Sequence, residues 1–198
     1  HLLADALAAA ALARAAGVDA EAVASGLRHY SPGAHRIVTV AEAGGVTWVD
    51  DSKATNPHSA EAALTSLPQG TGVWICGGDT KGAQFFDLVR TVRPHLRGAV
   101  VIGKDQSDIL AALEQEAPGL PVTRISHAAP EQVSATAVEA AGTMARSGDT
   151  VMLAPACASW DQFTSYAQRG DLFAAAAKAY AGGGTPETTD ASGVQEKL

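Results

Sequence analysis

Apolar runs alternate with amphipathic segments along most of the chain. A short apolar run predicts a buried strand, whereas apolar positions three and four residues apart predict a helix. Two alternating segments, RIVTVAE and GVTWVD, flank Gly44-Gly45 and predict a β-hairpin whose second strand ends at Asp50. The later elements are expected in this order: a helix from Asn56-Pro57 to about Ser66, strand GVWIC, helix 85–93, strand 98–103, helix 106–114, a short strand near Val122, helix 130–146, strand 150–156 and a helix from about Tyr166 to Tyr180.

This order of elements predicts the fold class. Strands that are apolar along nearly their whole length are typical of parallel sheets covered by helices on both faces. The composition agrees, because 46% of the residues are hydrophobic and only 5% are aromatic. We therefore expect an α/β domain with a doubly wound, mostly parallel Rossmann-like sheet that is entered through the β-hairpin.

Two helices precede this domain. Residues 2–16 and 20–29 have helical patterns, with Gly17 expected to end the first and Asp19 to cap the second. The turn residues Ser31-Pro32-Gly33 then predict a domain boundary. The first helix is apolar on nearly all faces, which is typical of a helix packed among partners. We therefore interpret it as part of a neighbouring domain of a longer protein.

Three regions result from this division: 1–33 as helices of a neighbouring domain, 34–181 as the α/β domain, and 182–198 as a disordered tail. The apolar stretch at the start is too short to span a membrane, and it carries Asp5 and Arg14. It also lacks the basic segment that opens a signal peptide. No membrane association is therefore expected.

Charge and cysteine content narrow the function classes. The formal net charge is −7 and no basic cluster is interleaved with aromatic residues, so nucleic acid is not an expected partner. Cys76 and Cys157 lie far apart in apolar or small-residue surroundings and are interpreted as buried thiols of a reducing cytosol. The six histidines lack metal-ligand spacing, so no metal site is expected within this chain.

Polar loops follow three of the predicted strands. They are DDSKATN (50–56), GGDTKG (77–82) and PACASWDQF (155–163). In an open α/β sheet, ligands bind beyond the carboxyl ends of the strands. Three such loops with unusual polar content therefore predict a ligand site, and an anionic ligand would suit a helix that begins at the end of the first loop.

Individual residues in these loops allow more than one interpretation. Lys81 could bind a carboxylate or phosphate or could be a solvated lysine, and Ser159 could donate to an anion, cap a helix starting near Asp161, or act as a nucleophile. The G-x-S-x-G context of many serine nucleophiles is missing. Arg36 could face a nucleotide or simply lie on the surface, and His35 receives no role from its chemistry.

The motifs HRIVTVAEAGGVTWVDDSKATNP, ICGGDTKG and LAPACASWDQFTSYAQRGDLF together resemble, in order and spacing, the C-terminal region of the Mur ligases. The resemblance covers about residues 1–180. The DSKAT form of the first loop is similar to the D-glutamate-adding branch, since sister ligases carry histidine-containing sequences there.

The resemblance implies a cytoplasmic, monomeric, three-domain enzyme of peptidoglycan synthesis. Such an enzyme adds D-glutamate to UDP-N-acetylmuramoyl-L-alanine through an acyl-phosphate intermediate, using ATP and Mg²⁺ held mainly by a central P-loop domain. Residues 1–33 would be the last helices of that central domain. Because no GxxxxGK[ST] motif occurs in the chain, we expect the chain alone to be inactive.

The resemblance also assigns candidate substrate-binding residues. Thr55, Lys81 and Ser159 match positions that hold the D-glutamate carboxylates. Trp160 and Tyr166 stand where the family often has Leu and Phe, and the Tyr166 ring is expected to pack on the ligand.

Candidate nucleotide contacts follow in the same way. Arg36 and Asp51 match residues that reach the ATP phosphates and ribose, whereas Lys53 receives no assigned contact. The family's HNxxN motif is altered here, with Leu2 and Asp5 at the two Asn positions. Asp5 can still accept a hydrogen bond from the nucleotide, whereas Leu2 cannot.

Two alternatives remain open. One is a sister Mur or folylpolyglutamate-type ligase that adds another amino acid, which a panel of acceptors would identify. The other is a non-catalytic ligand-binding module. A P-loop upstream of this chain would favour an enzyme over the module.

Overall fold

The computed structural model describes residues 2–31, 33–126 and 129–183. Most of the predicted disordered tail therefore lies outside the described residues. The chain forms two compact units, residues 1–33 and 34–198, which we describe separately. That the first unit belongs to an ATPase domain remains a prediction.

The first unit contains the two predicted helices, α1 (Leu2–Ala15) and α2 (Ala20–His29). Gly17 has a φ of 89°, as a left-handed helix end requires. The side chain of Asp19 accepts a hydrogen bond from the Ala22 N–H at 2.8 Å, which confirms the predicted cap. Within the part of the chain that is described, no helix combines the length and the apolar character needed to cross a membrane.

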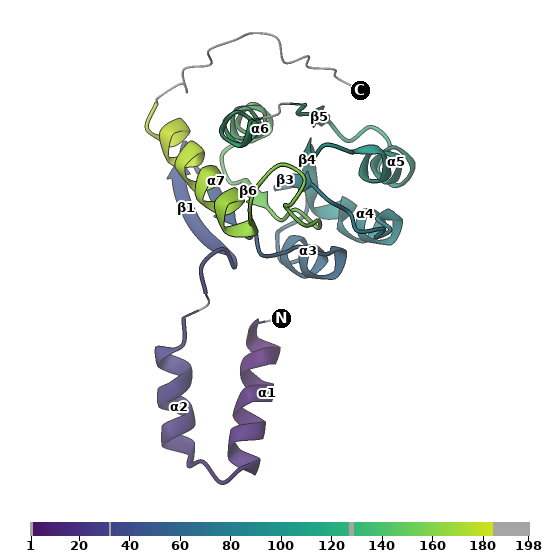
Figure 1. The fold of residues 1–198 in the computed structure, drawn as a ribbon. Helices are drawn as coiled ribbons and strands as arrows, with labels where there is room; N and C mark the ends of the chain where they lie inside the picture. Colours follow the sequence, from purple (N-terminus) through teal and green to yellow (C-terminus); the bar gives the residue numbers. More distant parts are fainter. Residues whose placement is uncertain (1, 32, 127–128, 184–198) are drawn as a thin grey trace. The chain divides into compact units, whose positions relative to one another are not determined.

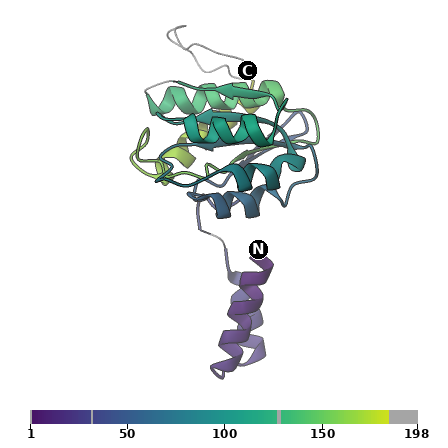
Figure 2. The ribbon, with the colours of Figure 1, turned by 90° about the vertical axis from the view of Figure 1, so that its right-hand side faces the viewer.

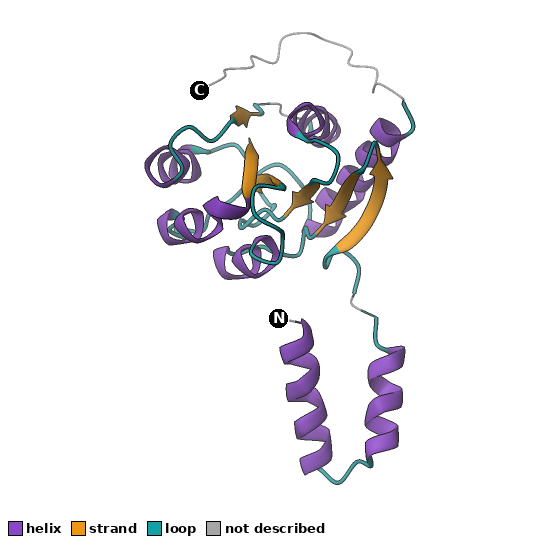
Figure 3. Ribbon diagram, turned by 180° about the vertical axis from the view of Figure 1, so that it is seen from behind, coloured by secondary structure: helices purple, strands orange, loops and turns teal. Residues whose placement is uncertain are grey.

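The second unit is built on a six-stranded sheet with the order β1-β2-β6-β3-β4-β5 (Figures 1 and 3). Strand β1 (Val38–Ala43) runs antiparallel to β2 (Val46–Asp50), which confirms the hairpin about Gly44-Gly45. All other pairings are parallel. The remaining strands are β3 (Gly72–Gly77), β4 (Leu96–Ile102), β5 (Val122–Arg124) and β6 (Thr150–Leu153).

Helices cover both faces of the sheet, as the apolar strands predicted (Figure 2). Trp74 of β3 points into the core beneath one set of helices, whereas its neighbour Val73 points into the core beneath the other. The first set is α3 (Pro57–Leu64), α4 (Phe86–Val92) and α5 (Ser107–Glu116); the second is α6 (Pro130–Met144) and α7 (Tyr166–Ala181). A short 3₁₀ helix, Arg93–His95, follows α4. The predicted doubly wound α/β fold is confirmed.

The predicted helix start near Asp161 is wrong. Residues 159–164 form turns and bends, and α7 begins only at Tyr166. Its cap is Ser165, whose hydroxyl accepts from the Gln168 N–H at 3.0 Å. Ser159 lies in a loop that pairs with the loop after β3, since Ala158 and Asp79 exchange two backbone hydrogen bonds of 2.9 Å. This tertiary pairing explains why no helix starts near Asp161 with Ser159 as its cap.

An ion pair links two neighbouring segments at the amino-terminal end of the sheet. Arg97 at the start of β4 donates from Nε and Nη2 to the carboxylate of Asp149, which is 2% exposed. The same carboxylate accepts from the Arg146 N–H at 2.7 Å. The ion pair therefore ties β4 to the turn that enters β6.

We expect Asp149→Ala to lower the free energy of unfolding by about 2–3 kcal/mol, because it leaves the Arg97 guanidinium and the Arg146 amide without their acceptor. Urea denaturation measures the change. The matched control is Asp87→Ala, which also removes a carboxylate bonded to an arginine, Arg90, but at a side chain that is 93% exposed. The control should change stability little. Equal effects of the two variants would contradict the interpretation.

Candidate functional site

The three polar loops meet at one edge of the sheet. They follow β2, β3 and β6, and β6 lies between the other two strands. Backbone hydrogen bonds join the loops: the Ala156 N–H donates to the Ala54 carbonyl at 2.9 Å, and the Gly77 N–H donates to the Pro155 carbonyl at 2.9 Å. The loops therefore form one continuous surface at the carboxyl ends of the strands.

A pocket with about 370 Å³ of empty space lies on this surface. All five residues predicted to bind the amino acid line it, and so do two others. The lining residues are Lys53, Thr55, Lys81, Ala158, Ser159, Trp160 and Tyr166. The pocket thus combines ammonium groups, hydroxyl groups and aromatic rings, a set that suits a small ligand carrying negative charge.

Lys81 is presented by a tight turn after β3. Its φ is 50°, and its N–H donates to the Asp79 side chain at 3.0 Å, so the carboxylate stabilises the turn. Gly78 allows this turn to touch the next loop, because a Cβ at that position would lie 2.3 Å from the Ala158 carbonyl oxygen. A side chain at Gly78 would therefore push Lys81 and Ser159 apart.

The aromatic side of the pocket contains a cation–π pair. The Lys53 Nζ lies 3.8 Å from the centroid of the Tyr166 ring. Trp160 is 68% exposed, so its indole borders the mouth of the pocket, whereas Ser159 is only 3% exposed. The pair brings a second ammonium group to the pocket in addition to Lys81.

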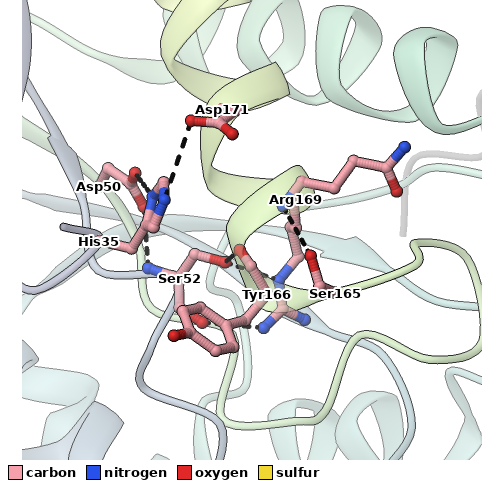
Figure 4. A network of polar contacts seen from close by, with 8 residues as sticks. His35, Asp50, Ser52, Ser165, Tyr166, Arg169 and Asp171 are labelled. Atoms are coloured by element: carbon pink, nitrogen blue, oxygen red, sulfur yellow. Dashed lines mark hydrogen bonds and ion pairs between the residues drawn. The ribbon is translucent and has the colours of Figure 1, made fainter.

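Arg169, which the sequence analysis missed, lies beneath these loops and is 1% exposed (Figure 4). Its Nε donates to the Ser52 hydroxyl at 3.0 Å, and its Nη2 donates to the carbonyls of Ser52 at 3.0 Å and Cys157 at 3.2 Å. Burial lowers the pKa of Arg169 to about 10, so it remains charged at neutral pH. The sequence signals were its place in the LAPACASWDQFTSYAQRGDLF motif and its charge within a helix predicted to pack on the sheet.

His35, which received no role, is also part of the network in Figure 4. Its Nδ1 lies 2.7 Å from Asp50 Oδ2 and its Nε2 lies 3.8 Å from Asp171 Oδ1. Helix α7 packs closely on this pair, since a Cβ at Gly170 would lie 2.2 Å from His35 Nδ1. The pair thereby anchors the segment that carries Arg36.

The two candidate nucleotide residues of this unit lie near each other. Asp51 is 7% exposed, and its burial raises its pKa to about 7. This value already includes a hydrogen bond from the Ile37 backbone and the charge of Arg36, which lower the pKa, and the neighbouring carboxylate of Asp50, which raises it. Arg36 is exposed. Asp5 is an exposed residue of α1 in the other unit, so its nucleotide contact stays a prediction.

Both cysteines are buried free thiols, as predicted. Burial raises the pKa of Cys157 to about 12 and raises that of Cys76 well above its usual value. Neither thiol is therefore ionised at neutral pH, and we assign neither a role in chemistry.

The family model for "Mur ligase, glutamate ligase domain" matches residues 35–157, which include the first two loops and the first three residues of the third. The chain belongs to the Mur ligase family. The resemblance read from the DDSKATN, GGDTKG and PACASWDQF motifs is thus confirmed.

Curated relatives agree with this assignment. The chain is 50% identical over 184 residues to a UDP-N-acetylmuramoylalanine–D-glutamate ligase of Bifidobacterium longum subsp. infantis, a match that covers 91% of this chain and 38% of that protein. It is 53% identical over 182 residues to the same-named protein of Frankia casuarinae, covering 92% and 37%. The Mur ligase chain described here therefore spans a little more than a third of the length of these relatives.

Solved structures share the fold at low sequence identity. MurF from Acinetobacter baumannii aligns with a TM-score of 0.56 and 17% identity, covering 87% of this chain and 37% of that one. The bifunctional folylpolyglutamate synthase/dihydrofolate synthase from Yersinia pestis aligns with a TM-score of 0.51 and 18% identity, covering 79% and 34%. These similarities support the architecture and carry no information about the substrate.

The raised pKa of Asp51 predicts a pH-dependent stability. Between the unfolded value of 3.8 and the folded value of about 7, the folded state keeps a proton that the unfolded chain has lost. The free energy of unfolding therefore falls as pH rises through this window. Relative to wild type, Asp51→Asn should gain roughly 2–4 kcal/mol between about pH 4 and pH 7.

Urea denaturation of wild type and Asp51→Asn at several pH values between about 4 and 8 measures this difference. Wild type serves as the control, because the two proteins share every titrating group other than Asp51. Parallel stability curves for the two proteins over this range would contradict the raised pKa.

Proposed function

We propose that this chain is the acceptor-binding portion of an ATP-dependent ligase that adds D-glutamate to UDP-N-acetylmuramoyl-L-alanine in peptidoglycan synthesis. The observation that carries the proposal is the pocket where Thr55, Lys81 and Ser159 meet. The family assignment and the names of the relatives at about half identity support it.

The chemistry of the pocket suits a dicarboxylic amino acid. The ammonium groups of Lys53 and Lys81 can neutralise two carboxylates, and the hydroxyl groups of Thr55 and Ser159 can donate hydrogen bonds to them. The Tyr166 ring offers an apolar surface for the methylene groups. A ligand with one carboxylate and a cationic side chain would instead place like charges together.

In this proposal the domain contributes positioning and charge neutralisation. The carboxyl group of the muramoyl substrate is activated as an acyl phosphate with ATP, and the amine of D-glutamate then attacks it and phosphate leaves. A pocket that holds both D-glutamate carboxylates leaves the amine free to face the acyl phosphate. Orientation of this kind lowers the barrier by removing translational and rotational freedom in advance.

The nucleotide side of the proposal rests on Arg36 and Asp51. The exposed Arg36 guanidinium suits phosphate oxygens. The Asp51 carboxyl has a pKa of about 7, so it can accept a hydrogen bond from a ribose hydroxyl when ionised or donate one to it when protonated. We propose that ATP and Mg²⁺ are held mainly by another domain of a longer cytoplasmic, monomeric enzyme, and that this chain alone is inactive.

The function is tested by phosphate release from the full-length protein with ATP, Mg²⁺ and UDP-N-acetylmuramoyl-L-alanine. D-glutamate, L-glutamate, L-lysine and diaminopimelate are compared as acceptors. We expect release with D-glutamate alone. Release with a different acceptor would indicate a sister ligase, and no release from a folded protein would favour a non-catalytic binding module.

In the full-length enzyme, Lys81→Ala should raise the KM for D-glutamate at least about tenfold, because a charge-assisted hydrogen bond to a carboxylate is lost. The KM for ATP should stay nearly unchanged. Lys104→Ala is the matched control, since Lys104 is an exposed lysine that follows the neighbouring strand β4 and does not line the pocket. An unchanged KM for D-glutamate in Lys81→Ala would exclude the proposed role.

A further inference from the structure

We propose that Ser52 is a positioning residue for the amino-acid pocket, because its hydroxyl holds together two walls that come from distant parts of the chain. The inference rests on the proposed function for the identity of the ligand. The sequence motifs gave Ser52 no role, and it does not line the pocket.

The Ser52 side chain is fully enclosed and uses its hydroxyl twice. The exposed fraction of Ser52 is 0%. Its Oγ donates to the carbonyl of Tyr166 at 2.7 Å and accepts from Arg169 Nε at 3.0 Å, as the dashed lines in Figure 4 indicate. The hydroxyl therefore bonds to two residues of α7 that lie more than a hundred positions away in sequence.

Two walls of the pocket meet at this junction. Lys53 and Thr55 follow Ser52 on the same loop, and Tyr166 is the first residue of α7. The hydroxyl bond to the Tyr166 carbonyl fixes the first turn of α7 against that loop. The cation–π pair between Lys53 and Tyr166, 3.8 Å apart, spans the same junction.

The serine is itself held in place from the other side. Its N–H donates to Asp50 Oδ1 at 2.9 Å, and Asp50 Oδ2 bonds to His35. Its carbonyl accepts from Arg169 Nη2 at 3.0 Å. These bonds fix the Ser52 backbone, so the hydroxyl is pre-organised between its two partners. Removing the hydroxyl would break the bond between the two walls but would not remove a group that contacts the ligand.

The kinetic test uses Ser52→Ala in the full-length enzyme. We expect the KM for D-glutamate to rise about tenfold, since a buried donor and a buried acceptor lose their partner at the pocket wall. The KM for ATP should stay within about twofold of wild type, a split that general destabilisation would not produce. Thr65→Val is the matched control. It removes a hydroxyl at the end of α3 that donates to the Glu61 carbonyl at 2.7 Å, and it should change neither KM.

A second test on the 198-residue chain needs no substrate. Chymotrypsin cleaves after exposed aromatic residues, and Trp160 is 68% exposed on the loop just before α7. Loosening of the junction in Ser52→Ala should speed cleavage after Trp160 several-fold over wild type and Thr65→Val. Cleavage after Tyr30, which is 66% exposed in the first unit, provides the internal reference and should not change.

The two tests separate the inference from the proposed function. If wild type shows no D-glutamate-dependent phosphate release, the proposed function fails, and proteolysis still decides whether Ser52 holds the loop against α7. If wild type is active and Ser52→Ala has an unchanged KM for D-glutamate, the positioning role is overturned. An unchanged rate of cleavage after Trp160 overturns it as well.

Discussion

Arg169 carries a positive charge into the interior of the α/β unit, and much of the site depends on how that charge is accommodated. A guanidinium removed from water is tolerated only where its N–H groups find acceptors. Here the acceptors are the Ser52 hydroxyl and the carbonyls of Ser52, Cys157 and Ala158, which belong to two different loops. The hydrogen bonds of this one buried cation therefore hold both loops against the start of α7.

Sheet topology makes this arrangement possible. Because β6 lies between β2 and β3, the loops that follow these three strands emerge side by side. Close backbone approach then joins them, and Gly78 is required where the Ala158 carbonyl comes within reach. The pocket side chains are thus held by backbone contacts and by a buried network, so their positions are set before a ligand binds.

The two edges of the site share the same supports. Asp50 bonds to His35 beside the candidate nucleotide residues, and it also bonds to the Ser52 N–H beneath the amino-acid pocket. Gly170 lets α7 pack directly on the His35–Asp50 pair. In the proposed ligase, whose acceptor and nucleotide must meet in one geometry, a common support for both sets of residues would be a physical advantage.

The sequence by itself determined the local elements, because periodicity records which side of each strand or helix is buried. The hairpin about Gly44-Gly45, the cap at Asp19, the parallel α/β class and the three polar loops could all be predicted from short stretches. The family resemblance also named five of the seven residues that line the pocket, and the structure brings these five together.

Only the tertiary structure decided the strand order, the loop that replaces the helix start expected near Asp161, and the network of His35, Ser52 and Arg169. Ser52 and Arg169 are separated by 117 positions, and no local pattern links them. Their pairing follows from the place of α7 on the sheet and from the requirement that a buried charge be hydrogen-bonded, which are properties of the whole fold.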